Sequence, residues 1–139
     1  LPVQVQIEPP GDFGWFARLK GAGVEALGLH LEVWDEAVLA RVAPGKAAQG
    51  RDHYLAAWEA AAEVFGRGQV STYFILGLGE APESVMEGVR AAVDRGVYPF
   101  VVPLRPAPGS IVADGVPPPA EYVRDVYERV APLLAEARM

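Results

Sequence analysis

The amino-acid sequence predicts an α/β fold built from four consecutive parallel β/α units, which make half of a TIM-type barrel. Four β-prone runs are each followed by apolar residues at helical spacing, an alternation typical of parallel strands joined by right-handed crossovers. Two of these runs carry polar residues opposite their aliphatic side chains, although buried parallel strands are usually aliphatic throughout. The polar faces therefore favour a barrel wall around a ligand cavity over an open sheet covered on both sides.

The first unit begins with a strand that has two unlike faces. In residues 3–8, aliphatic residues alternate with Gln4, Gln6 and Glu8. A Pro-Pro-Gly sequence ends this strand, and Asp12 is placed to cap the helix that follows. The apolar residues of that helix lie at helical spacing until two glycines end it.

The second unit repeats this pattern. Its strand is predicted over residues 26–33, where aliphatic residues alternate with Gly28, His30 and Glu32. Asp35 is expected to cap a short helix, which ends at a Pro-Gly pair.

A polar loop is predicted over residues 46–52, followed by a longer helix. The apolar stripe of that helix consists of Tyr54, Trp58, Ala61 and Phe65. We expect these residues to be core rather than a stacking platform. His53 lies on the opposite side of the helix and is expected at the surface, and the two histidines of the chain are too few for a zinc site.

The third unit carries the strongest ligand signal. A β-prone run in residues 70–80 breaks at Gly77 and Gly79 and reaches Glu80, and Pro82 then opens a helix. A strand that ends in glycines just before a helix is where α/β folds place their ligands.

The fourth unit consists of a strand over residues 98–104, a Gly/Pro-rich loop and a last helix. Pro132 is predicted to kink or fray the end of that helix. No boundary of a second domain is visible in the sequence, so residues 1–139 are predicted to form a single domain.

Composition excludes several classes of function. With 51% hydrophobic and 22% charged residues the chain is expected to be globular, and no apolar run approaches membrane-spanning length. A net charge of −6 and the lack of a clustered basic face argue against a nucleic-acid partner. The chain has no cysteine and no visible signal peptide, so a cytoplasmic protein without disulfides is expected. Its start at Leu1, with a strand already under way, is interpreted as the start of a fragment.

Residues 73–80, Tyr-Phe-Ile-Leu-Gly-Leu-Gly-Glu, resemble the G-x-I-x-G-x-x-E pattern of radical S-adenosylmethionine (SAM) enzymes, and biotin synthase in particular. Ile75, Gly77 and Glu80 match this pattern, and Tyr73 replaces its first glycine. In that family the isoleucine packs against the adenine of SAM and the glycine lets the backbone approach it. The resemblance therefore implies that Ile75 and Gly77 contact adenine.

Residues 29–32 are similar to the N-H-N-[LI]-[DE] stretch of biotin and lipoyl synthases, in which the Asn and the acid reach the SAM ribose. The resemblance implies this role for His30 and Glu32. It also implies that Arg51 meets the methionyl carboxylate and that Val102 is a backbone contact to adenine. The Pro-Ala-Pro-Gly-Ser sequence after the fourth strand resembles the P-x-P-G-T loop at the mouth of the family's barrel.

The resemblance implies the carboxy-terminal half of a radical SAM enzyme that binds SAM and acts on a small substrate. In the complete protein a [4Fe–4S] cluster would help to generate a 5′-deoxyadenosyl radical for hydrogen abstraction. The family holds that cluster with a C-x3-C-x2-C loop, and a chain without cysteine cannot, so this half alone is predicted to be inactive. A missing amino-terminal half or a homodimer is expected to cover the open sheet edges.

Two other functions remain open: a non-catalytic half-barrel for binding or assembly, and a cluster-free TIM-type lyase or aldolase. The lyase would use Glu8, Glu32 or Glu80 as a base, but no lysine stands at a strand end to form a Schiff base. Glu80 is explained equally well by a ligand contact and by the helix N-terminus that follows it. His30 is equally well an interior histidine, and Arg105 is a loop cation or, less favoured, a contact for a substrate carboxylate.

Overall fold

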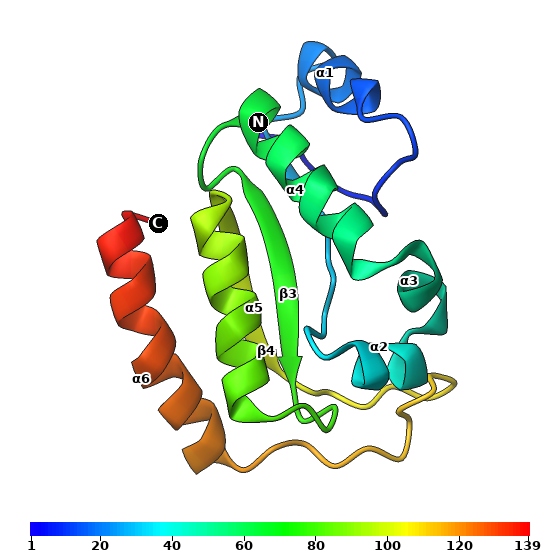
Figure 1. The fold of residues 1–139 in the computed structure, drawn as a ribbon, viewed down its shortest axis with the longest axis vertical. Coiled ribbons are helices and arrows are strands. Elements are labelled where there is room, and N and C mark those ends of the chain that lie inside the picture. The colour runs from blue at the N-terminus through cyan, green and yellow to red at the C-terminus, as the bar shows by residue number, and fades with distance from the viewer.

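The computed structural model describes all 139 residues, which form one sheet of four parallel strands with helices between them (Figure 1). The strands are adjacent in chain order: β1 (Gln4–Gln6), β2 (Ala26–Gly28), β3 (Val70–Leu76) and β4 (Val97–Pro103). The six helices are α1 (Gly14–Gly21), α2 (Glu36–Val42), α3 (Pro44–Gln49), α4 (Arg51–Phe65), α5 (Pro82–Asp94) and α6 (Ala120–Ala137). The predicted α/β class and the four parallel units are confirmed.

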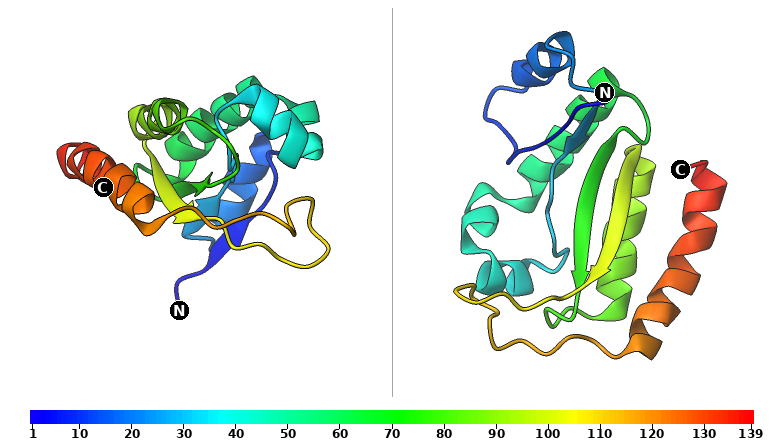
Figure 2. Two further views of the ribbon diagram at one scale, coloured as in Figure 1. Left: turned by 90° about the horizontal axis from the view of Figure 1, so that it is seen from below. Right: turned by 180° about the vertical axis from the view of Figure 1, so that it is seen from behind.

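The helices cover one face of the sheet and leave the other open. Helices α4 and α5 lie across the front of the strands in Figure 1, and the view from behind in Figure 2 shows β3 and β4 with no helix across them. On this open face the Phe100 side chain is 42% exposed. Because the strands follow one another without exchange, the sheet is built like part of a barrel wall.

The core lies between the sheet and the covering helices. The stripe of α4 predicted as core is buried, with Tyr54, Trp58 and Ala61 fully inaccessible and Phe65 5% exposed. The apolar face of α5 is buried in the same core. None of the six helices combines the length and the apolarity that crossing a bilayer requires.

The close contact between α5 and β3 depends on Gly88. A Cβ atom at this position would lie 2.6 Å from Cε1 of Phe74 and 3.0 Å from Cβ of Trp34. We expect Gly88→Ala to lower the free energy of unfolding by about 1–3 kcal/mol, because the buried ring would have to move. Gly45→Ala in α3, where nothing lies within 4 Å, is the control and should be neutral or stabilising. Urea titrations of both variants check this, and equal behaviour would contradict it.

Strand β2 is shorter than predicted because the chain bulges after it. The amide of Leu29 donates to the Ser71 carbonyl, and the amide of Glu32 donates to the Tyr73 carbonyl, each over 2.9 Å. The chain thus advances three residues, from Leu29 to Glu32, while β3 advances only two, from Ser71 to Tyr73. This extra residue defines a β-bulge over residues 29–32. Glu32 has a φ of +74°, outside the range that most side chains adopt. The aliphatic face predicted for residues 26–33 is nevertheless fully buried.

The polar loop predicted over residues 46–52 is wrong. Helix α2 does end at Val42, but Pro44 stands at the first position of α3 and α4 begins at Arg51. Proline is favoured there because its missing N–H would lack a helical partner in any case. This short helix carries Lys46 toward the sheet.

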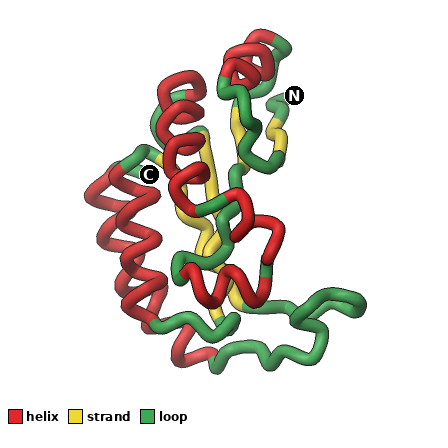
Figure 3. The backbone as a smooth tube through the Cα atoms, turned by 45° about the vertical axis from the view of Figure 1, so that its right-hand side comes forward, coloured by secondary structure: helices red, strands yellow, loops and turns green.

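The predicted helix ends agree with the structure in most places. Asp35 Oδ1 accepts from the Val38 amide over 2.9 Å and caps α2. Asp12 Oδ1 accepts from the Gly14 amide, also over 2.9 Å, but Phe13 occupies the N-cap position of α1, so the predicted cap is wrong by one residue. The fraying predicted at Pro132 is not seen, since α6 continues past it to Ala137. The loop between β4 and α6 passes the carboxyl ends of the strands (Figure 3).

Candidate functional site

A cavity of about 670 Å³ lies at the carboxyl ends of β3 and β4, under the loop that follows β4. Three of the six residues predicted to bind SAM line it: Glu32, Ile75 and Val102. Ile75 and Val102 are register partners on neighbouring strands, and the Ile75 amide donates to the Glu32 carbonyl over 2.9 Å. The other lining side chains are mostly apolar and include Leu78, Leu104 and Tyr127. The cavity thus joins a carboxylate to an apolar wall.

Gly77 lies at the turn just after β3, beside this cavity. It is exposed and has a φ of +101°, which favours glycine. A Cβ atom there would lie 2.9 Å from Cδ of Pro118 and 3.4 Å from Cβ of Leu104, which lines the cavity. The turn and the close approach of the last loop therefore both require glycine.

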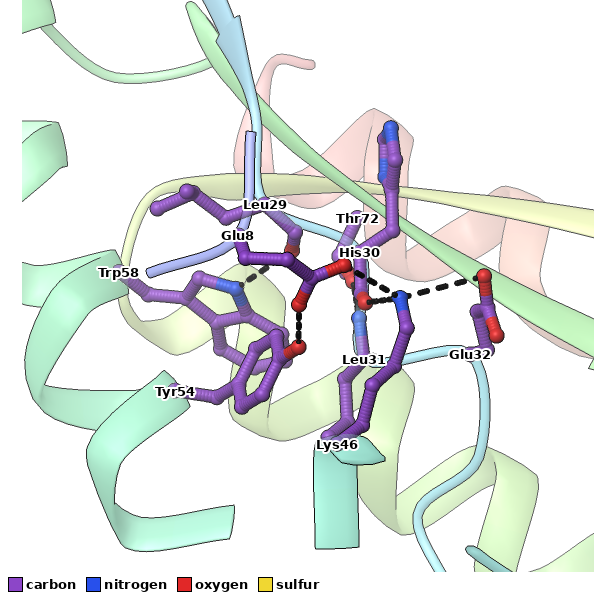
Figure 4. A network of polar contacts seen from close by, with 9 residues as sticks. All are labelled: Glu8, Leu29, His30, Leu31, Glu32, Lys46, Tyr54, Trp58 and Thr72. Atoms are coloured by element: carbon purple, nitrogen blue, oxygen red, sulfur yellow. Dashed lines mark hydrogen bonds and ion pairs between the residues drawn. The ribbon is translucent and has the colours of Figure 1, made fainter. Parts of the chain in front are cut away.

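His30 does not reach the cavity. Its ring stacks on Tyr73 with 4.3 Å between centroids and lies so close to Gly28 that a Cβ atom there would be 2.7 Å from Nε2. Neither ring nitrogen has a hydrogen-bond partner. Burial, and then the nearby Lys46 ammonium, lowers the pKa of His30 to about 4. In Figure 4 the ring points away from the carboxylates of Glu8 and Glu32.

The lowered pKa predicts a stability change with pH. Between pH 6.5 and about 4 the unfolded chain binds more protons at His30 than the folded chain does, so stability should fall as the pH is lowered through this window. After discounting for partial exposure, we expect a loss of about 1–2 kcal/mol. Denaturant titrations at several pH values check this loss. His30→Gln should flatten the dependence of stability on pH in this window, and His53→Gln is the matched control. An unchanged pH dependence in His30→Gln would show that His30 is not its cause.

Arg51 is the first residue of α4 and does not line the cavity. Its guanidinium is 4.6 Å from the centroid of the Trp34 ring, and Nη1 donates to the Trp34 carbonyl over 3.1 Å. Nη2 lies 3.6 Å from Glu36 Oε2. The structure does not bring Arg51 together with Glu32, Ile75 and Val102.

Glu80 links the loop after β2 to the start of α5. Its Oε1 atom accepts from the amides of Trp34 and Asp35, over 2.9 and 2.6 Å, and from Ser84 Oγ over 2.7 Å. Burial raises the pKa of this carboxyl, although the three hydrogen bonds favour its charged form. These contacts favour a positioning role over the ligand contact that the sequence left open.

Lys46 joins the two polar strand ends in a network that the sequence did not predict (Figure 4). Its Nζ atom lies 3.3 Å from Glu8 Oε1 and 3.2 Å from Glu32 Oε1, and it donates to the His30 carbonyl over 2.6 Å. The Tyr54 hydroxyl donates to the other oxygen of Glu8. Pro44 ahead of residues that favour helix was the signal that could have placed Lys46 on a helix. Lys46 does not lie at the end of a strand, but its ammonium group reaches the ends of β1 and β2 from α3.

Arg105 also lines the cavity, just past the end of β4. It forms no ion pair within the chain. No group of three or more histidine, aspartate or glutamate side chains is arranged to hold a metal ion. The lining of the cavity is therefore mostly apolar and includes one carboxylate, of Glu32, and one guanidinium, of Arg105.

The chain is an α/β protein whose fold resembles part of the barrel of two solved radical SAM enzymes. Coproporphyrinogen III oxidase (HemN) from Escherichia coli, a radical SAM enzyme, matches 98% of this chain and 32% of its own, with a TM-score of 0.70 and 16% identity. A radical SAM methyltransferase from Sphaerobacter thermophilus matches 92% of this chain and 37% of its own, with a TM-score of 0.71 and 16% identity. The resemblance predicted from the sequence is confirmed at the level of the fold.

A particular relative is also similar in sequence. Bacteriochlorophyllide c C-7(1)-hydroxylase from Chlorobaculum limnaeum is 33% identical over 135 residues, which cover 96% of this chain and 33% of the hydroxylase. The chain thus spans about a third of the length of this relative. No family model matches the sequence.

Proposed function

We propose that the chain is the adenosyl-binding half of a radical SAM enzyme. The observation that carries this proposal is the convergence of Glu32, Ile75 and Val102 on one cavity at the carboxyl ends of the strands. The sequence resemblance predicted Glu32 to contact ribose and Ile75 and Val102 to contact adenine, and these three residues lie on or just after three different strands. The likeness of the fold to radical SAM enzymes supports the proposed class of protein.

The residues of the cavity fit an adenosyl group. Ile75 and Val102 lie side by side and offer an apolar surface to a flat base. The Glu32 side chain is 30% exposed, so its carboxylate is accessible to a ligand. An ionised carboxylate accepts several hydrogen bonds, which suits the two adjacent hydroxyls of a ribose. Gly77 keeps the turn beside the cavity free of a side chain.

The residues present do not fit an iron-sulfur cluster. Radical SAM chemistry uses a cluster held by cysteine thiolates to supply the electron that cleaves SAM. The chain has no cysteine and no alternative group of metal ligands. We therefore assign it ligand binding alone, and we propose that an amino-terminal half, or a second chain, carries the cluster and covers the open face where Phe100 is exposed.

A second candidate is a non-catalytic module that binds an adenosyl compound. The lack of cysteine favours it, since binding at Glu32, Ile75 and Val102 does not require the cluster. The two candidates share one site and differ in whether a cluster-bearing segment completes the protein. Hydrogen abstraction by the completed protein with reconstituted cluster distinguishes them.

The experiment that tests the proposed site is an NMR titration of the chain with 5′-deoxyadenosine. This method detects weak binding, which we expect because only part of the full contact surface is present. The amide signals of Ile75, Gly77 and Val102 should shift together and saturate. If signals at other surfaces shift and these three do not, the proposal is wrong.

A further inference from the structure

Lys46 makes one hydrogen bond and two ion pairs, all of them to groups at the two strand ends. An ammonium group has three donors, and Nζ has three acceptors within reach: the His30 carbonyl at 2.6 Å, Glu32 Oε1 at 3.2 Å and Glu8 Oε1 at 3.3 Å. The side chain is only 17% exposed. Lys46 is thus positioned to hold other groups in place rather than to receive a ligand itself.

The segment that Lys46 holds is the least regular part of the sheet. Within the bulge, the Leu31 amide donates to the side chain of Thr72 over 3.0 Å, in place of a backbone partner. Glu32 adopts a φ of +74°, which a side-chain-bearing residue keeps only when its surroundings impose it. Lys46 contacts this segment twice, through a hydrogen bond to the carbonyl of His30 and an ion pair with the carboxylate of Glu32.

The other end of the network fixes Lys46. Glu8 is held by the hydroxyl of Tyr54, whose ring is fully buried in α4. Burial and the hydrogen bond to Glu8 raise the pKa of Tyr54, which favours the protonated hydroxyl that donates to Glu8. The contacts therefore run from the core through Glu8 and Lys46 to the carboxylate in the cavity.

We propose that Lys46 is a positioning residue that sets the bulge at residues 29–32 and aims the Glu32 carboxylate at the ribose hydroxyls of the ligand. This inference rests on the proposed function, because it assigns a role within the same site. It assigns no contact between Lys46 and the ligand. It predicts that the effect of Lys46 on binding passes through Glu32.

The test is a double-mutant cycle on the chain, with dissociation constants for 5′-deoxyadenosine measured by NMR titration. Lys46→Met should weaken binding about fivefold in the wild-type background and less than about twofold when Glu32 is already glutamine. Adenine, which lacks the ribose, should bind the wild type and Lys46→Met equally. If Lys46→Met unfolds, Lys46→Gln replaces it in the cycle. Because glutamine keeps a hydrogen-bond donor, its expected loss of affinity is smaller.

The outcomes separate this inference from the proposed function. If Glu32→Gln weakens binding and Lys46→Met does not, the site stands and the positioning role is wrong. If Lys46→Met weakens adenine as much as 5′-deoxyadenosine, its role is general stability and the inference is also wrong. If the wild type does not bind 5′-deoxyadenosine, the proposed function fails. One readout needs no ligand: the amide signals of residues 29–32 should shift in Lys46→Met, and unchanged signals would overturn the role in the bulge.

Discussion

Replacing Glu32 with alanine is expected to weaken 5′-deoxyadenosine binding by about ten- to a hundredfold. The carboxylate lines the cavity and can accept from two neighbouring hydroxyls of a ribose. A hydrogen bond to a charged group contributes about 1.5–3 kcal/mol, and each 1.4 kcal/mol corresponds to a tenfold change in affinity. Glu32→Gln keeps one acceptor oxygen and should fall at the low end of this range. Dissociation constants from NMR titrations measure both losses.

The matched control is Glu59→Ala, which removes a carboxylate that pairs with Arg95 away from the cavity. It should leave binding unchanged. Adenine binding should also be unchanged in Glu32→Ala, since the base contacts Ile75 and Val102 in this assignment. A loss of affinity for adenine equal to that for 5′-deoxyadenosine would show that Glu32 supports the cavity as a whole and does not recognise ribose.

The sequence predicted the secondary structure that depends on neighbouring residues, although the ligand roles of the residues in it stay predictions. Ile75 and Gly77 follow from a short pattern at the end of one strand, and the structure has that strand and its turn where the pattern puts them. Val102 was indicated by the family resemblance alone, and in the structure it is the register partner of Ile75 on β4.

The sequence could not place residues that depend on distant partners. His30 and Glu32 have strand spacing, which predicts two side chains on one face, but the bulge separates them. That bulge uses the side chain of Thr72, 41 residues along the chain. The network of Lys46 was missed for the same kind of reason, since its partners Glu8 and Glu32 come from two other strand ends.

Glu80 shows how such contacts decide between two roles that the sequence leaves equal. A carboxylate just before a helix can favour the helix N-terminus or bind a ligand. In the structure its Oε1 atom serves the amides of Trp34 and Asp35, about one β/α unit earlier in the chain. These bonds tie the loop that follows the bulge to the start of α5.

Replacing Glu80 with alanine is therefore expected to lower the free energy of unfolding by about 2–4 kcal/mol. Two partly buried amides would lose their acceptor, and an unsatisfied buried donor costs about 1–3 kcal/mol. Glu80→Gln keeps an oxygen for these amides and should cost less than about 1 kcal/mol. Ser84→Ala, which removes only the third contact, is the control. Urea unfolding curves measure all three, and equal stability of the alanine and glutamine variants would contradict the role given to the two amides.

The pH dependence of Glu80→Gln gives an independent check of the same site. Burial raises the pKa of Glu80 in the folded state above its usual 4.5, so the folded chain binds this proton more tightly than the unfolded chain. The contribution of this group to stability should therefore fall as the pH rises from 4.5 through the raised pKa. Glutamine cannot titrate, so the stability of the variant relative to the wild type should increase over that range. A difference that stays constant with pH would mean that the carboxylate is not buried as the three hydrogen bonds at its Oε1 atom require.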